Sequence, residues 1–121
     1  MKLYQIYAAG NFIAASVETP FLQIGEHKYG KPILDRALSH ETSVLDGVKL
    51  ALVSMDSTLR SNLSVGLPVD LTTVERDACA TGVRRRIGED DPYFADLRGR
   101  WSDSLRAALA SAPDPIWGDE A

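Results

Sequence analysis

The hydrophobic residues of this 121-residue chain change their spacing from period 2 to period 3.6 and back again along its length. Period 2 is the spacing of a half-buried β-strand, and period 3.6 is that of an amphipathic helix. Aromatic and β-branched residues gather at 3–7 and at 12–17, with the turn residues Gly10 and Asn11 between them. These two stretches predict an antiparallel hairpin at the start of the chain. The residues from 19 to 29 then predict an irregular connection.

Two helices are predicted next. Pro32 suits the first turn of a helix, where its missing N–H is not needed, and this predicts a helix over 31–38. Apolar residues at helical spacing predict a longer helix over 42–61, with Thr42 or Ser43 as its N-cap. Because only a short break joins them, we expect an antiparallel pair, in which the start of the first helix lies near the end of the second.

The strand pattern then returns at 67–75 and at 81–87, which predicts a second hairpin. Asp91 followed by Pro92 is a strong start signal for a last helix, because aspartate caps it and proline fits its first position. One stripe of this helix has apolar residues at steps of three and four, and we expect it to be buried against the sheet. The stripe consists of Phe94, Leu97, Trp101, Leu105 and Ala108.

The predicted order of hairpin, helix pair, hairpin and helix is that of the α+β class, with helices packed on antiparallel strands. The length suits one domain over 1–121, in which residues 113–121 form a loose tail. Two separated hairpins, however, make a thin sheet for three amphipathic helices. This imbalance is typical of a chain cut from a larger domain.

Charge and cysteine content exclude several classes of protein. A net charge of −4 and a pI near 5.1 argue against a nucleic-acid-binding protein, which usually has a basic face. Cys79 is the single cysteine, so neither an intrachain disulfide nor a cysteine-rich metal site is expected. No apolar run reaches the roughly 18 residues of a membrane span, and the first residues lack the apolar segment of a signal peptide. We expect a cytoplasmic protein that needs no cofactor, metal, nucleic acid or membrane.

Histidines and arginines give no clear ligand site. His27 and His40 each adjoin a glutamate, without the H-E-x-x-H spacing that places two histidines on one helix face. The arginine run 84–86 lies in a predicted strand, where its first and last members share one face and its middle member takes the other. We expect a solvated or ion-paired edge, with the acidic run 89–91 as a partner, rather than a phosphate site.

Three segments resemble the ancestral beta subunit, a bacterial homologue of the proteasome, and they occur in the same order as in that family. They are LQIGEHKYGKPILDR at 22–36, DSTLRSNLSVGLPVDL at 56–71 and DDPYF at 90–94. The resemblance extends over nearly the whole chain, which makes it far more specific than any short motif.

This resemblance implies an N-terminal-nucleophile hydrolase with a four-layer αββα sandwich, of which this chain would be the C-terminal half. In that family a threonine or serine at the mature N-terminus attacks the scissile carbonyl, and its own α-amino group acts as the base. The chain begins with Met1 and Lys2, which offer neither hydroxyl nor thiol. We therefore expect this chain to lack the nucleophile and to be inactive alone.

The resemblance also implies a set of supporting residues. Ser64 falls where proteasome subunits have a supporting serine, with Gly66 in the glycine turn after it. Ser61 falls where they commonly have an aspartate, and Glu26 where they commonly have a serine. Ser64 would hydrogen-bond the N-terminal amine or relay its proton through water. The structural alternative is that Ser64 caps the turn between helix and strand.

Two hypotheses about function follow. The first is part of a proteasome-like threonine or serine peptidase, which assembles with identical subunits and acts on peptides when its N-terminal half is present. The alternative is a catalytically inactive scaffold or interaction module with the same fold. Because a half-domain leaves apolar surface uncovered, self-association is expected under both hypotheses.

Overall fold

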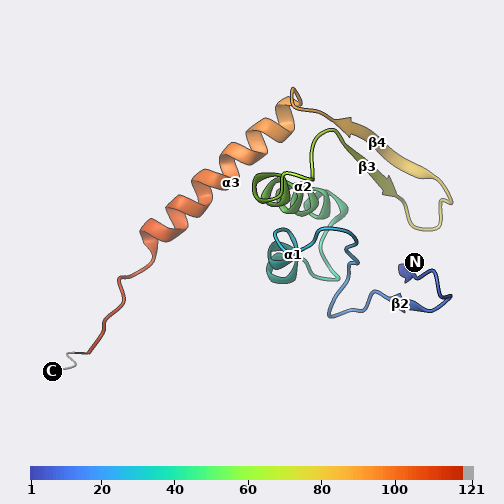
Figure 1. The fold of residues 1–121 in the computed structure, drawn as a ribbon, viewed down its shortest axis with the longest axis horizontal. Coiled ribbons are helices and arrows are strands. Elements are labelled where there is room, and N and C mark those ends of the chain that lie inside the picture. The colour runs from blue at the N-terminus through green and yellow to red at the C-terminus, as the bar shows by residue number, and fades with distance from the viewer. Residues whose placement is uncertain (119–121) are drawn as a thin grey trace.

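The computed structural model describes residues 1–118, which form two separate two-stranded antiparallel sheets and three helices (Figure 1). The elements, in chain order, are β1 (Tyr4–Ile6), β2 (Phe12–Ala14), α1 (Lys31–Ala37), α2 (Val44–Ser61), β3 (Val69–Val74), β4 (Thr81–Ile87) and α3 (Pro92–Ser111). The α+β class and the predicted element order are confirmed. The strands of the first hairpin are shorter than predicted. Of the predicted tail, residues 119–121 lie outside the described residues.

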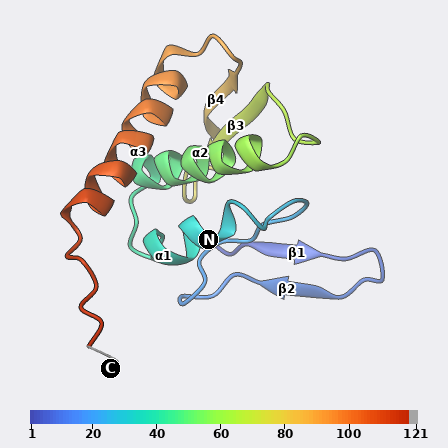
Figure 2. The ribbon, with the colours of Figure 1, turned by 60° about the vertical axis from the view of Figure 1, so that its left-hand side comes forward.

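The helix pair lies between the two hairpins. Figures 1 and 2 both show β3 and β4 on the α2 side of the pair and the β1–β2 hairpin on the α1 side. The last helix, α3, starts directly after β4 and packs against α2 near its own first turns. Its C-terminal end leads away from both hairpins (Figure 1). No helix among residues 1–118 combines the length and the apolar character needed to cross a membrane.

The two long helices begin where side chains can satisfy their free N–H groups. Ser43 caps α2 and accepts a hydrogen bond from the Asp46 N–H at 3.1 Å. Asp91 caps α3 and accepts from the Phe94 N–H at 2.9 Å. The Phe94 N–H and the Arg85 guanidinium hold the pKa of the Asp91 carboxyl below its usual range. Of the two caps that the sequence allowed for α2, Ser43 is therefore the one used.

The hydrophobic core lies where α2, the end of β4 and the first turn of α3 meet. Leu52, Ile87 and Phe94 are its buried members, and each comes from a different one of these elements. Half-buried apolar residues of α2, of β3 and the loop before it, and of α3 complete this cluster, namely Val48, Leu59, Leu67, Val69, Leu71 and Leu97. The core therefore depends on α2, which contacts both the second hairpin and α3.

The burial of the α3 stripe ends early, and the prediction that the whole stripe is buried is wrong. Phe94 is 1% exposed and Trp101 is half-buried, but Leu105 is 53% exposed and Ala108 is exposed too. The spacing correctly identified the apolar face of the helix. It could not show that residues 1–118 supply a contacting surface only for the first turns of that face.

A close backbone approach joins α1 to α2. Gly30, which caps α1, is buried, and a Cβ at this position would collide with the Ser54 side chain and lie 2.8 Å from the Ser54 carbonyl oxygen. The same Cβ would lie 3.1 Å from the Thr58 hydroxyl. Glycine is therefore required here by space, since its backbone angles are ordinary ones.

A buried carboxylate joins α2 to α3. The Asp56 side chain is 3% exposed, and its Oδ1 accepts a hydrogen bond from Arg98 Nε at 2.6 Å. Arg60, one turn further along α2, donates to the same carboxylate at 3.2 Å. The Arg98 guanidinium also lies over the Phe94 ring, 5.2 Å from its centroid. A charge removed from water in this way stabilises the native state only with such partners in place.

Gly30→Ala should destabilise the chain by about 1–3 kcal/mol, because the added methyl group forces α1 away from α2. The loss would be measured by urea unfolding. Gly47→Ala is the matched control, since a Cβ at Gly47 meets no atom within 4 Å and the position lies in α2. It should stabilise the chain by about 0.5–1 kcal/mol through helix propensity. Equal effects of the two substitutions would contradict the close approach.

Asp56→Ala should destabilise the chain by about 2–3 kcal/mol, because it leaves two arginines without their shared acceptor. Asp96→Ala is the control, since Asp96 pairs with Arg100 on the surface with its side chain 59% exposed. That substitution should cost less than about 1 kcal/mol. Unfolding curves for both variants at one protein concentration make the comparison. A cost for Asp56→Ala no larger than that of the control would show that the buried carboxylate does not join the helices.

Candidate active site

The loops that the sequence places at one end of the helix pair do meet in the structure. Asn62 follows the last residue of α2, and its Nδ2 donates to Glu26 Oε2 at 3.1 Å, across 36 positions of sequence. Glu26 lies in the loop before α1 and is half-buried. The antiparallel arrangement of the helices brings the two loops together, as predicted.

The Asn62 side chain connects Glu26 to Ser64. Its Oδ1 accepts two hydrogen bonds from Ser64, one from the backbone N–H at 2.9 Å and one from the hydroxyl at 2.6 Å. A side-chain oxygen that accepts from the N–H two residues later forms an Asx turn, which fixes the backbone between helix and strand. Glu26, Asn62 and Ser64 therefore form one connected polar network.

The three residues singled out from the sequence do not all join this network. Glu26 also accepts from the Lys28 N–H at 3.3 Å, so its carboxylate contacts both loops. Ser64 is exposed, with its hydroxyl on Asn62. Ser61 ends α2 on the exposed side, and within residues 1–118 its hydroxyl has no hydrogen-bond partner. The geometry therefore connects Glu26 with Ser64 and leaves Ser61 outside.

Asn62 is the member that reasoning from the sequence missed. The available signal was local, since an asparagine directly after a helix and two residues before a serine is a common Asx-turn arrangement. Its contact with Glu26 had no such signal, because it depends on how α1 and α2 pack.

Within residues 1–118, the Ser64 hydroxyl has no base beside it that would make it a nucleophile by itself. Its hydroxyl donates to an amide oxygen, which does not take up a proton at neutral pH. The His27 Nδ1 is occupied by the Gly25 carbonyl oxygen at 3.1 Å. His40 precedes α2, whose 18 residues place it about 27 Å from the Ser64 end. Over residues 1–118 no group of three histidine, cysteine or acidic side chains could hold a metal ion.

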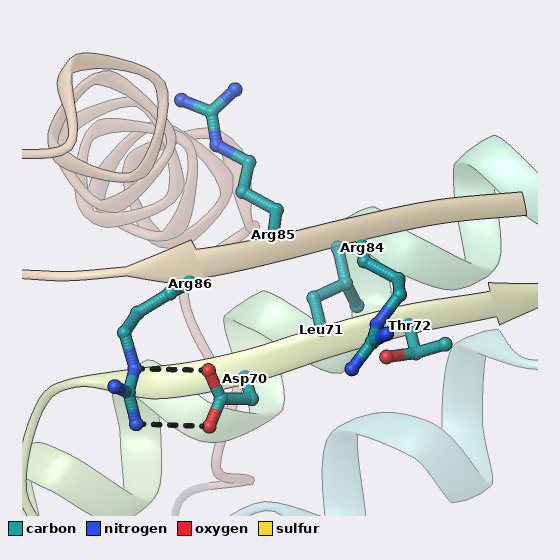
Figure 3. A pocket seen from close by; sticks show the side chains of 6 residues that line it. All are labelled: Asp70, Leu71, Thr72, Arg84, Arg85 and Arg86. Atoms are coloured by element: carbon teal, nitrogen blue, oxygen red, sulfur yellow. Dashed lines mark hydrogen bonds and ion pairs between the residues drawn. The ribbon is translucent and has the colours of Figure 1, made fainter. Parts of the chain in front are cut away.

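The arginine run of β4 is divided as its alternation predicts. Arg86 pairs with Asp70 directly across the ladder, with Nε–Oδ1 and Nη2–Oδ2 distances of 3.0 and 3.2 Å (Figure 3). Arg85 points to the other face and binds Asp91 through Nη2 at 2.6 Å. Arg84 shares the face of Arg86 and lies across from Thr72. Two of the three arginines are therefore ion-paired, one of them with the acidic run predicted as a partner.

Scans of family models and of curated proteins gave no match to this chain. Solved structures do match it, and three of them are Anbu structures. An Anbu (Gly-1) mutant from Hyphomicrobium sp. strain MC1 is 52% identical with a TM-score of 0.92. Anbu, the ancestral beta-subunit, from Yersinia bercovieri is 50% identical with a TM-score of 0.90. The helical assembly of the Anbu complex from Pseudomonas aeruginosa is 50% identical with a TM-score of 0.89.

These three structures cover 96–98% of this chain, whereas the chain spans 49–50% of each of theirs. A sequence identity of 52% across 96% of the chain defines the class of protein, which is that of the proteasome-like beta subunits. Within that class the chain belongs to the Anbu family, over about half the length of a subunit. The resemblance of the segments at 22–36, 56–71 and 90–94 is thereby confirmed.

Proposed function

We propose that this chain is the C-terminal half of an N-terminal-nucleophile peptidase subunit, and that it supplies the support for a nucleophile carried by a complementary half. The Glu26–Asn62–Ser64 network is the observation that carries the proposal. It brings together two segments that resemble the family, and it leaves a serine hydroxyl accessible at the surface. The 50% coverage of Anbu subunits leaves room for such a complementary half in the complete fold.

The reaction proposed is hydrolysis of a peptide bond in two steps. The hydroxyl oxygen of the nucleophile bonds to the scissile carbonyl carbon while its proton passes to the nucleophile's own α-amino group. The C–N bond then breaks, and the leaving amine takes up that proton. Water adds to the resulting ester and releases the acid. In this scheme Ser64 holds the α-amino group in place, and Glu26 and Ser61 lie beside it in supporting positions.

A second candidate function, an inactive scaffold of the same fold, is favoured by one observation. The exposed Ser61 stands where proteasome subunits commonly have an aspartate, and it is not part of the polar network. A site without that carboxylate has less to hold the charged form of the α-amino group. The complete subunit would then contribute to assembly and not to proteolysis.

Assembly is proposed under both functions. Apolar side chains stand exposed on the first hairpin, where Tyr4, Ile6 and Phe12 are 45%, 74% and 62% exposed. Leu105 and Leu109 are exposed on α3. Exposed apolar side chains that lie close together usually contact another chain or domain. The Pseudomonas aeruginosa relative, which forms a helical assembly, supports self-association of the complete subunit.

The complete subunit, formed from this chain and its complementary half, should hydrolyse a fluorogenic peptide, and this chain alone should not. Ser64→Ala should lower kcat about 100-fold in the complete subunit, the lower end of the range for groups that assist proton transfer. Ser104→Ala, an exposed serine on α3, is the matched control and should leave kcat unchanged. Absence of turnover in the complete subunit would favour the scaffold. Turnover by this chain alone that is lost in Ser64→Ala would make Ser64 the nucleophile.

A further inference from the structure

We infer that Asn62 is a positioning residue, which orients the Ser64 hydroxyl so that it can only accept a hydrogen bond from the nucleophile's α-amino group. The inference rests on the proposed function, because it assigns the polarity of contacts within that site. It concerns a residue that the sequence did not single out, and it follows from three hydrogen bonds.

The orientation of the Asn62 amide is decided by the backbone. An N–H group can only donate, so the side-chain atom 2.9 Å from the Ser64 nitrogen must be the oxygen, Oδ1. The amide nitrogen then faces Glu26 Oε2 at 3.1 Å, and a carboxylate accepts that bond. Both ends of the amide agree, so a flipped amide would place two donors together at Ser64 and two acceptors together at Glu26.

The orientation of the Ser64 hydroxyl follows from that of the amide. Its Oγ lies 2.6 Å from Oδ1, and an amide oxygen has no proton to give, so the hydroxyl is the donor. A serine hydroxyl has one proton and two lone pairs. With its proton directed at Asn62, the exposed Ser64 can present only lone pairs to a group outside the network.

This polarity is the one that an amine base requires. An α-amino group acts as a base through its nitrogen lone pair, which must stay free to take the proton of the nucleophile's hydroxyl. A serine that accepts from the amine's N–H holds it without using that lone pair. A serine that donated to the amine would occupy the lone pair and block the base. Asn62 therefore selects the productive one of two possible hydrogen bonds.

Exchanging the polar groups of Asn62 and Glu26 tests this assignment in the complete subunit. Asn62→Asp alone places two carboxylates at a separation of 3.1 Å, so their repulsion should displace the loop. Glu26→Gln alone keeps an acceptor for Asn62 and measures what the Glu26 charge itself contributes, so it is the reference for the double variant. The double variant N62D/E26Q has the same net charge as the unsubstituted pair. It also restores one donor facing one acceptor, and it keeps the acceptor for Ser64.

The first measurement is steady-state hydrolysis of a fluorogenic peptide. Asn62→Asp should lower kcat at least about tenfold with KM little changed, as expected for a residue that orients a catalytic group. The double variant should be faster than Asn62→Asp and should reach the kcat of Glu26→Gln alone. Thermal unfolding of each variant separates loss of orientation from loss of fold. A double variant that folds normally but is as slow as Asn62→Asp would overturn the inference.

The second measurement does not depend on turnover. In the complete subunit with its nucleophile labelled with ¹⁵N, NMR titration gives the pKa of the α-amino group. An acceptor stabilises the ammonium form, so Asn62→Ala, which frees Ser64 to donate to the amine, should lower that pKa. An unchanged or raised pKa would overturn the inference. If the complete subunit hydrolyses no peptide, the proposed function fails, while this titration still decides the role of Asn62.

Discussion

A carboxylate taken out of water between two helices fixes where the last helix can lie. Asp56 projects from α2 with its side chain 3% exposed, and Arg98 reaches it from α3. An ionised carboxylate loses much of its hydration at such a position. It is stable there only where cations and hydrogen-bond donors contact it. Arg60 and Arg98 meet that requirement from two directions. The first turns of α3 are therefore held in one place on α2, and Phe94 is buried beside them.

The same helix, α2, carries the candidate site at its C-terminal end. Its middle contacts the second hairpin through Leu52, and its last turn leads to Asn62 and the loop that contains Ser64. Because the core and the polar network lie along one rigid element, the loop has a fixed position relative to the rest of the chain. A chain that spans half of an Anbu subunit and has a core of its own can in this way hold polar side chains in a defined geometry.

Local rules predicted most of the elements, and non-local contacts account for what they missed. The bounds of β4 and the caps Ser43 and Asp91 depend on residues close in sequence, and the structure agrees with them. The burial of Asp56 could not be predicted, because the arginine that compensates it lies 42 positions away. The same applies to Asn62, whose contact with Glu26 exists only after α1 and α2 have packed. For α3, periodicity identified the apolar face but carried no information about how far a contacting surface extends.

The close contact at Gly30 restrains the two loops of the candidate site relative to each other. Gly30 directly follows the loop that contains Glu26, and Thr58, which lies beside it, accepts a hydrogen bond from the Asn62 N–H through its carbonyl oxygen at 2.9 Å. The last turn of α2 thus contacts the start of α1 through Thr58 and leads directly into the loop that contains Ser64. Because atoms in close contact resist compression steeply, a shift of α1 toward α2 at Gly30 would disturb the packing of the two helices that carry these loops. The relative position of Glu26, Asn62 and Ser64 therefore depends on a steric contact at Gly30, which lies outside the polar network itself.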